Sequence, residues 1–227
     1  MLNFDPARFL RIQTGTVSIA RDLGTLVGRL VAEGADSLFF MGSGGAGILM
    51  QPATDLMRRA SNLPCHNVLC AEIVLTGHVA LGPKSVVIMP SLSGTTKESI
   101  AAMDYVKARG ATVISITGHA DTPLAKGADH AFVNFAEDDT SCEMFYVTSL
   151  VAALSAMQAR GERSDYDRIS GELAGLPQQL LAVKQAFEPR ADALAQAIAG
   201  DGWHILTGSG AAWPEAYYYG MCILEEM

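Results

Sequence analysis

The stretch SLFFMGSGGAG, residues 37–47, decides the fold. Its opening run over residues 37–41 is continuously apolar apart from one serine, which is typical of a strand buried on both faces of a sheet. The glycines and serine at 42–45 then predict a tight turn. Apolar residues continue over 48–57 at the spacing of a helix. The stretch therefore predicts a strand, a glycine turn and a helix in succession.

Short apolar runs of the same kind recur along the next hundred residues. Helical segments separate most of them, notably residues 98–109, and the runs lie at 67–70, 85–89, 112–117 and 130–133. Unbroken apolar strands that alternate with helices are typical of a parallel sheet covered by helices on both faces. The sequence therefore predicts an α/β fold, a parallel-sheet sandwich of the flavodoxin-like type that holds its ligand at the carboxyl ends of the strands.

Helices are predicted on either side of this unit. Apolar residues recur at helical spacing over 4–32, which indicates an amphipathic helix ahead of the first strand. Residues 142–160 are apolar on nearly every side, which indicates a buried helix. Glycine and charged residues at 161–167 indicate a linker, and helical stretches follow from 166 to about 199.

The plan of the opening stretch returns near the end of the sequence. Residues 203–213 read WHILTGSGAAW, so that Gly208-Ser209-Gly210 stands where Gly42-Ser43-Gly44 stood. We interpret this as the start of a second copy, with a strand and a helix over 214–226. The prediction is a tandem repeat whose second copy is incomplete, within a longer polypeptide. Its segments are a helical lead-in (1–36), a first domain (37–160), a helical linker (161–202) and the start of a second domain (203–227).

Composition excludes several classes of protein. The 227 residues are 49% hydrophobic, and 16 basic against 24 acidic residues leave a net charge of −8. No basic cluster is dense enough for DNA, RNA or an anionic membrane. No apolar run reaches the roughly 20 residues that cross a bilayer, and the N-terminus lacks a signal peptide, so we expect a soluble cytoplasmic protein. The four cysteines fit neither a disulfide framework nor paired metal ligands, so we expect reduced thiols and no metal.

The stretch SVVIMPSLSGTTKES, residues 85–99, is the most informative about chemistry. A buried strand runs into Ser91, Ser93 and Gly94 and then into a helix. Glycine lets a ligand approach the backbone, and the N–H groups at a helix start favour an anion. Neutral donors of this kind can hold a phosphate even in an acidic protein. A simpler interpretation stays open, because Thr95-x-x-Glu98 is also a capping box that needs its hydroxyl only to start the helix.

These residues resemble a known family, the sugar isomerase (SIS) domain proteins, whose signature is Ser-x-Ser-Gly-x-Thr-x-Glu. Residues 91–98 match it in full, and the glycine turn at 42–44 and the pair Ala71-Glu72 follow the family's order. A chain with two copies is similar to the isomerase half of glucosamine-6-phosphate synthase and to the fructosamine-6-phosphate deglycases. The resemblance implies that the substrate phosphate is bound by Ser91, Ser93, Gly94 and Thr96.

The resemblance also implies residues around the sugar. The glycine turn, with Gly42, Ser43 and Gly44, would border it. Apart from the resemblance, Ser141 and Glu143 are further candidates, because a hydroxyl and backbone N–H groups at the start of the buried helix could lie near a ligand. Ser141 could also serve only to cap that helix.

The catalytic base of the relatives lies late on the helix after the second glycine turn, and the resemblance places Glu226 there. A carboxylate that reaches both C1 and C2 of an open-chain sugar can move a proton between them. Glu225 could equally be the inward residue, or both could face solvent. The relatives also use a histidine beyond this glutamate, and no residue after Met227 is present to take that role. Where the synthase carries lysines on this helix, Ile223 and Glu225 stand here, which favours the deglycases.

The resemblance thus implies an enzyme, a phosphosugar isomerase or deglycase acting on a 6-phosphorylated ketose or amino sugar, with fructosamine 6-phosphate favoured. It implies no metal or organic cofactor, a small-molecule phosphosugar as the partner and a homodimer. The alternative is a module that senses a phosphosugar without turning it over. DNA-binding regulators of the family carry a basic helix-turn-helix ahead of the sugar domain, and the 36 residues that precede the first strand here have no such cluster. The sequence leaves open the sugar, the amine and the choice between these activities.

Overall fold

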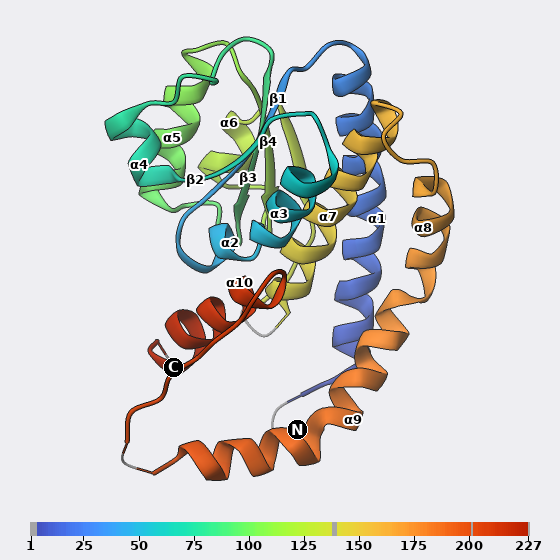
Figure 1. Cartoon of the computed structure of the whole chain (residues 1–227), viewed down its shortest axis with the longest axis vertical. Helices are drawn as coiled ribbons and strands as arrows, with labels where there is room; N and C mark the ends of the chain where they lie inside the picture. Colours follow the sequence, from blue (N-terminus) through green and yellow to red (C-terminus); the bar gives the residue numbers. More distant parts are fainter. Residues whose placement is uncertain (1–3, 138–139, 201, 227) are drawn as a thin grey trace.

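The computed structural model of the protein describes residues 4–137, 140–200 and 202–226. The fold is built on a five-stranded parallel sheet (Figure 1). The strand order is β2-β1-β3-β4-β5. The strands are β1 (Ser37–Gly42), β2 (Cys65–Leu69), β3 (Ser85–Ser91), β4 (Thr112–Thr117) and β5 (His130–Val133). Each strand overlaps one of the predicted apolar runs, and all four pairings are parallel. The predicted fold class is confirmed.

Helices cover both faces of the sheet. One face packs against α1 (Pro6–Ala32), α3 (Gln51–Ala60) and α7 (Ser141–Ala159), and the other against α4 (Cys70–Thr76), α5 (Lys97–Lys107) and α6 (Pro123–Gly127). Successive side chains of a strand point to opposite faces. Leu38 and Phe40 accordingly enter the first core, while Phe39 and Met41 enter the second. This burial on both sides is the reason why β1 reads as a continuous apolar run.

Helix α7 is the predicted buried helix. It lies against α1, where Ser155 Oγ donates a hydrogen bond to the carbonyl of Gly24 at 2.6 Å. By length and composition alone α7 could cross a membrane, but 61% of its most apolar window is buried inside the fold. That burial is typical of the core helix of a globular domain.

The C-terminal part is helical and leaves the sheet. It contains α8 (Tyr166–Glu172), a 3₁₀ turn (Leu173–Gly175), α9 (Leu176–Ile198), α10 (Ala212–Tyr218) and a π-helical segment (Tyr219–Leu224). Figure 1 shows α9 running away from the sheet and α10 returning beside the short helix α2 (Gly44–Ile48). The helix predicted over 214–226 is therefore present, although it begins two residues earlier and ends in a π-helical segment.

The strand predicted at the start of the second copy is wrong. Residues 203–209 form no strand, and the side chains of Trp203 and Ile205 are 100% and 89% exposed. An isolated strand leaves its backbone groups unpaired, and no strand among the described residues lies beside this segment to pair with it. The tandem repeat itself stays a prediction.

Candidate functional site

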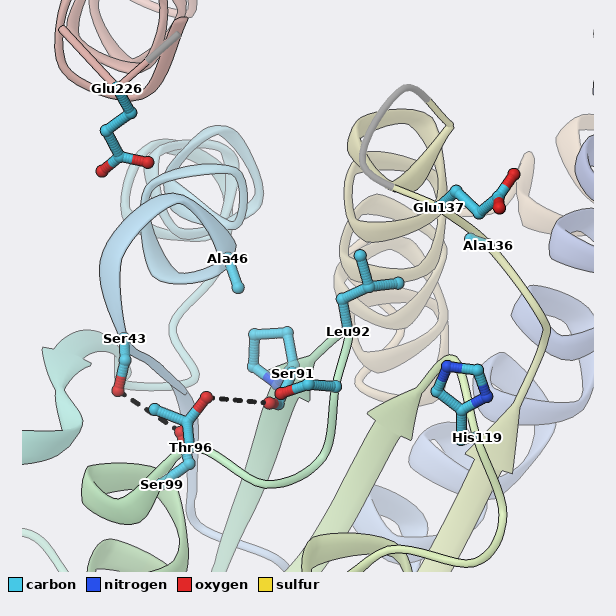
Figure 2. Close-up of a pocket in the computed structure, with 12 residues that line it drawn as sticks. Ser43, Ala46, Ser91, Leu92, Thr96, Ser99, His119, Ala136, Glu137 and Glu226 are labelled. Carbon is cyan, nitrogen blue, oxygen red and sulfur yellow. Dashed lines mark hydrogen bonds between the residues drawn. The ribbon is translucent and has the colours of Figure 1, made fainter.

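A cavity of about 700 Å³ opens at the carboxyl ends of the central strands. Ser43 follows β1, Ser91 ends β3, and the loop after β3 adds Ser93 and Thr96. Glu226 reaches the same cavity from the C-terminal segment (Figure 2). The structure therefore brings together five of the residues that the sequence singles out, although they are up to 183 positions apart.

The loop after β3 is held by hydrogen bonds to Ser91. Its Oγ accepts from the backbone N–H of Gly94 at 3.2 Å and lies 3.4 Å from Thr96 Oγ1. Gly94 has a φ of +64°, and a Cβ there would come within 2.3 Å of Thr122 Oγ1. Only glycine fits this position. Gly94 therefore shapes the loop and does not line the cavity with a side chain.

The capping box predicted over 95–98 is wrong. Helix α5 begins at Lys97, so Thr96 is the N-cap residue, and its side chain makes no capping hydrogen bond. The hydroxyl of Thr95 donates instead to Ser93 Oγ at 3.1 Å. The hydroxyl of Thr96 faces the cavity beside Ser91 (Figure 2).

These hydroxyls surround the start of an 11-residue helix. The first N–H groups of a helix have no acceptor within the helix, and its dipole places partial positive charge at this end. Ser91, Ser93 and Thr96 line the cavity beside the first turn of α5, from which Ser99 lines it as well. Such an arrangement suits a phosphate.

The glycine turn after β1 forms the neighbouring wall. Ser43 Oγ lies 3.3 Å from Ser99 Oγ on α5, so the turn is tied to the helix that follows β3. Gly44 has a φ of +53°, and a Cβ on Gly42 would approach the Cα of Gly47 to 2.7 Å. Gly42 and Gly44 therefore permit the turn, while Ser43 is the member that lines the cavity.

Glu226 is the acidic residue of the C-terminal segment that lines the cavity, and Glu225 is absent from the lining. Both glutamates directly follow the π-helical segment over 219–224. The structure thus distinguishes two adjacent glutamates that the sequence leaves equivalent.

Glu226 is positioned by a close contact between α10 and α2. A Cβ on Gly45 would approach Tyr218 Cε2 to 2.7 Å and Cys222 Sγ to 3.2 Å. We expect Gly45→Val to push the C-terminal segment outward and to increase alkylation of Cys222 by iodoacetamide about fivefold or more, since thiol reactivity follows exposure. Residue-resolved mass spectrometry measures this rate. Cys65 is an internal control, because burial raises the pKa of its thiol to about 12. An unchanged rate at Cys222 would show that this contact does not hold the segment.

Two candidates at the start of α7 have other roles. Thr140, and not Ser141, is the N-cap residue of α7, so the predicted cap is wrong. Ser141 lines a second, adjacent cavity. Glu143 forms an ion pair with Lys184 of α9 at 2.9 Å and lines neither cavity. The structure therefore does not bring Glu143 to the site.

Three further residues line the cavity that were not predicted as site residues from the sequence. Ser99 lies in the first turns of α5, His119 follows β4, and Glu137 follows β5 and pairs with Arg8 of α1. The imidazole of His119 packs edge-on against Phe135, with ring centroids 5.8 Å apart. His119 could have been found, because the carboxyl ends of parallel strands meet at one edge of the sheet. No sequence signal marks Glu137.

The polar groups of the cavity are hydroxyls, N–H groups, two carboxylates and an imidazole. Over residues 4–137, 140–200 and 202–226 no group of three or more His, Cys, Asp and Glu side chains is placed to hold a metal ion. The arrangement can bind an anion at the start of α5 and move a proton with a carboxylate at Glu226.

Known proteins resemble this chain along much of its length. The family model described as the SIS domain matches residues 33–160. The fructosamine deglycase of Bacillus subtilis is 26% identical over 217 residues, which cover 93% of this chain and 65% of the deglycase. An uncharacterized HTH-type transcriptional regulator of Caldanaerobacter subterraneus is 37% identical over 97 residues, covering 42% of this chain and 33% of the regulator. This chain thus spans less than two thirds of the length of these relatives.

Among solved structures, the C-terminal domain of glucosamine-fructose-6-phosphate aminotransferase from Francisella tularensis superposes with a TM-score of 0.74. The alignment covers 91% of this chain and 65% of that structure at 14% identity. This likeness shows a shared fold.

Proposed function

Because the chain belongs to the SIS domain family, we propose that the protein is a phosphosugar isomerase or deglycase, and that its substrate is a fructosamine 6-phosphate. The fructosamine deglycase of Bacillus subtilis, which aligns along 93% of the chain, supports this choice. A related 6-phosphorylated ketose or amino sugar would fit the same site. A metal or an organic cofactor is not needed for the proposed proton transfer.

The arrangement of hydroxyls at the start of α5 carries the proposal. Ser91, Ser93 and Thr96 line the cavity together, and the side chain of Thr96 makes no hydrogen bond that caps its helix. A phosphate dianion can accept from these hydroxyls and from the first N–H groups of α5. The 6-phosphate would fix one end of the open-chain sugar there.

Glu226 supplies the proposed chemistry at the other end of the sugar. Its carboxylate takes the proton from C1 of the open-chain ketone, the electron pair forms a C1–C2 double bond, and O2 gains a proton from water. Glu226, whose carboxyl proton exchanges with solvent, then gives a proton to C2, and C1 becomes doubly bonded to the protonated nitrogen. The hydroxide left by that water adds to C1, its proton passes to nitrogen as the C1–N bond breaks, and the products are an aldose 6-phosphate and a free amine. One carboxylate that acts as base and then as acid suffices for both proton steps.

We further propose that the protein acts in the cytoplasm as a homodimer. Exposed apolar side chains on one helical face of α9 support an association, namely Val183, Phe187 and Leu194. Sedimentation equilibrium of the purified protein tests this statement.

A sensor of phosphosugars is the second candidate function. The observation that favours it is the 37% identity over 97 residues to a transcriptional regulator. A sensor would bind fructose 6-phosphate in the same cavity without exchanging protons. Glu226 would then have no chemical role.

Proton exchange separates the two candidates. We expect the protein, incubated with fructosamine 6-phosphates in deuterated water, to release amine and to place deuterium at C2 of the aldose 6-phosphate. NMR detects both products. Fructose 6-phosphate and glucosamine 6-phosphate serve as comparison substrates for isomerisation. Tight binding of all three compounds, with neither label nor amine, would favour the sensor and contradict the enzyme.

A further inference from the structure

A second cavity of about 390 Å³ adjoins the first. Ala46, Leu92 and Glu226 line both cavities, so these three residues form the border between them. Ser91, Ser93 and Thr96 line the first cavity only. Glu226 therefore lies between the hydroxyl loop and the second cavity.

Apolar surface makes up somewhat more than half of the second cavity. Leu49, Phe145 and Ile223 contribute aliphatic and aromatic surface, and Tyr218, Cys222 and Ser141 add weakly polar groups. The hydroxyl of Tyr218 lies 3.0 Å from Cys142 Sγ. Among the described residues that line this cavity, Glu226 alone carries a formal charge. The nearby carboxylate of Glu143 is paired with Lys184 and lies outside the lining.

The order of groups along the substrate matches the order of the two cavities. With the 6-phosphate at the start of α5 and C1 and C2 beside Glu226, the nitrogen on C1 points past Glu226. The second cavity opens on that side. This step rests on the proposed function, since it takes the substrate to be a fructosamine 6-phosphate.

We propose that the second cavity is the subsite for the leaving amine, and that it selects amines with an apolar substituent. A branched aliphatic or aromatic group would bury its surface against Leu49, Phe145 and Ile223. The carboxylate of an α-amino acid would instead enter an apolar cavity whose one formal charge is negative, which is costly without a cation to pair with it.

Binding and turnover of matched compounds test the proposal. The compounds are fructosamine 6-phosphates made from methylamine, phenethylamine and glycine, with dissociation constants measured by calorimetry and amine release measured alongside. We expect the phenethylamine compound to bind at least about tenfold more tightly than the methylamine compound, because the ring leaves water. The glycine compound should bind no more tightly than the methylamine compound.

Two variants on neighbouring positions locate the effect. Ile223→Trp fills the cavity and should remove the preference for phenethylamine while binding of the methylamine compound changes less than about threefold. Met221→Trp is the matched control, because Met221 is exposed and lines neither cavity, so the preference should persist.

The outcomes separate this inference from the proposed function. Release of methylamine without any preference for the larger apolar amine would overturn the subsite and leave the deglycase standing. The expected preference in binding, with no amine released from any compound, would support the subsite and contradict the deglycase. Failure of all three compounds to bind would overturn both.

Discussion

Glu226→Gln is expected to slow amine release and the exchange of the C1 proton about a thousandfold. The amide has the shape of the carboxylate and lacks its basicity, and a positioned general base contributes about 10²–10⁴ to a rate. The dissociation constant of fructose 6-phosphate should change less than about threefold, because salt screens the interaction between the removed charge and the phosphate at the start of α5. Single-turnover kinetics and calorimetry measure the two effects.

Glu225→Gln is the matched control. It removes the same charge at the adjacent position, where the side chain does not line the cavity. Its rate should stay within about threefold of the unaltered protein. Equal loss of activity in both variants would mean that the rate depends on the negative charge of the C-terminal segment and not on proton transfer by Glu226. Full activity of Glu226→Gln would remove Glu226 as the base.

Loss of the hydroxyls at positions 93 and 96 is expected to have the second largest effect. Hydrogen bonds to a charged partner contribute about 1.5–3 kcal/mol each, so Ser93→Ala combined with Thr96→Val should raise KM about a hundredfold or more. The rate at saturating substrate should fall much less, because these groups hold the phosphate and not the reacting carbons. Steady-state kinetics measure both parameters.

Thr95→Val controls for this pair. Thr95 is exposed and lies outside the cavity, although its hydroxyl contacts Ser93, so its replacement should change KM less than about threefold. The free energy of unfolding, measured in urea, should be similar for all these variants. A KM unchanged in the double variant would mean that the phosphate binds elsewhere.

The sheet was predictable from the sequence because its strands are buried on both faces. Phe39 and Phe40 point to opposite cores, so the strand reads as one unbroken apolar run bounded by turn residues. The same pattern failed at residues 203–209. The pattern predicts how a segment pairs if neighbouring strands are present, and there Trp203 and Ile205 have no strand beside them among the described residues.

The candidate site was predictable where a local motif carries it. The loop of Ser91, Ser93 and Thr96 follows from a strand, a glycine and a helix start in sequence. The exact helix start did not follow, because a shift of one residue exchanges Thr95 and Thr96 as the cap. The choice of Glu226 rested on resemblance, because the residues around it do not tell which of Glu225 and Glu226 points inward. That depends on how the C-terminal segment packs, and Glu226 is the one that lines the cavity.

Residues that depend on tertiary packing were the least predictable. His119 and Glu137 enter the cavity because β4 and β5 end at the same edge as β3, and this order is set by the crossovers of the sheet. Glu143 was predicted near the sugar, but it pairs with Lys184 of α9 and lines neither cavity. The sequence spacing between positions 143 and 184 gives no sign of that ion pair.

A crystal structure of the protein with bound fructose 6-phosphate tests the central claim most directly. The account predicts phosphate oxygens within hydrogen-bond distance of the hydroxyls of Ser91, Ser93 and Thr96, with C1 and C2 beside the carboxylate of Glu226. A phosphate bound away from the start of α5, or a sugar whose C1 and C2 lie out of reach of Glu226, would contradict it.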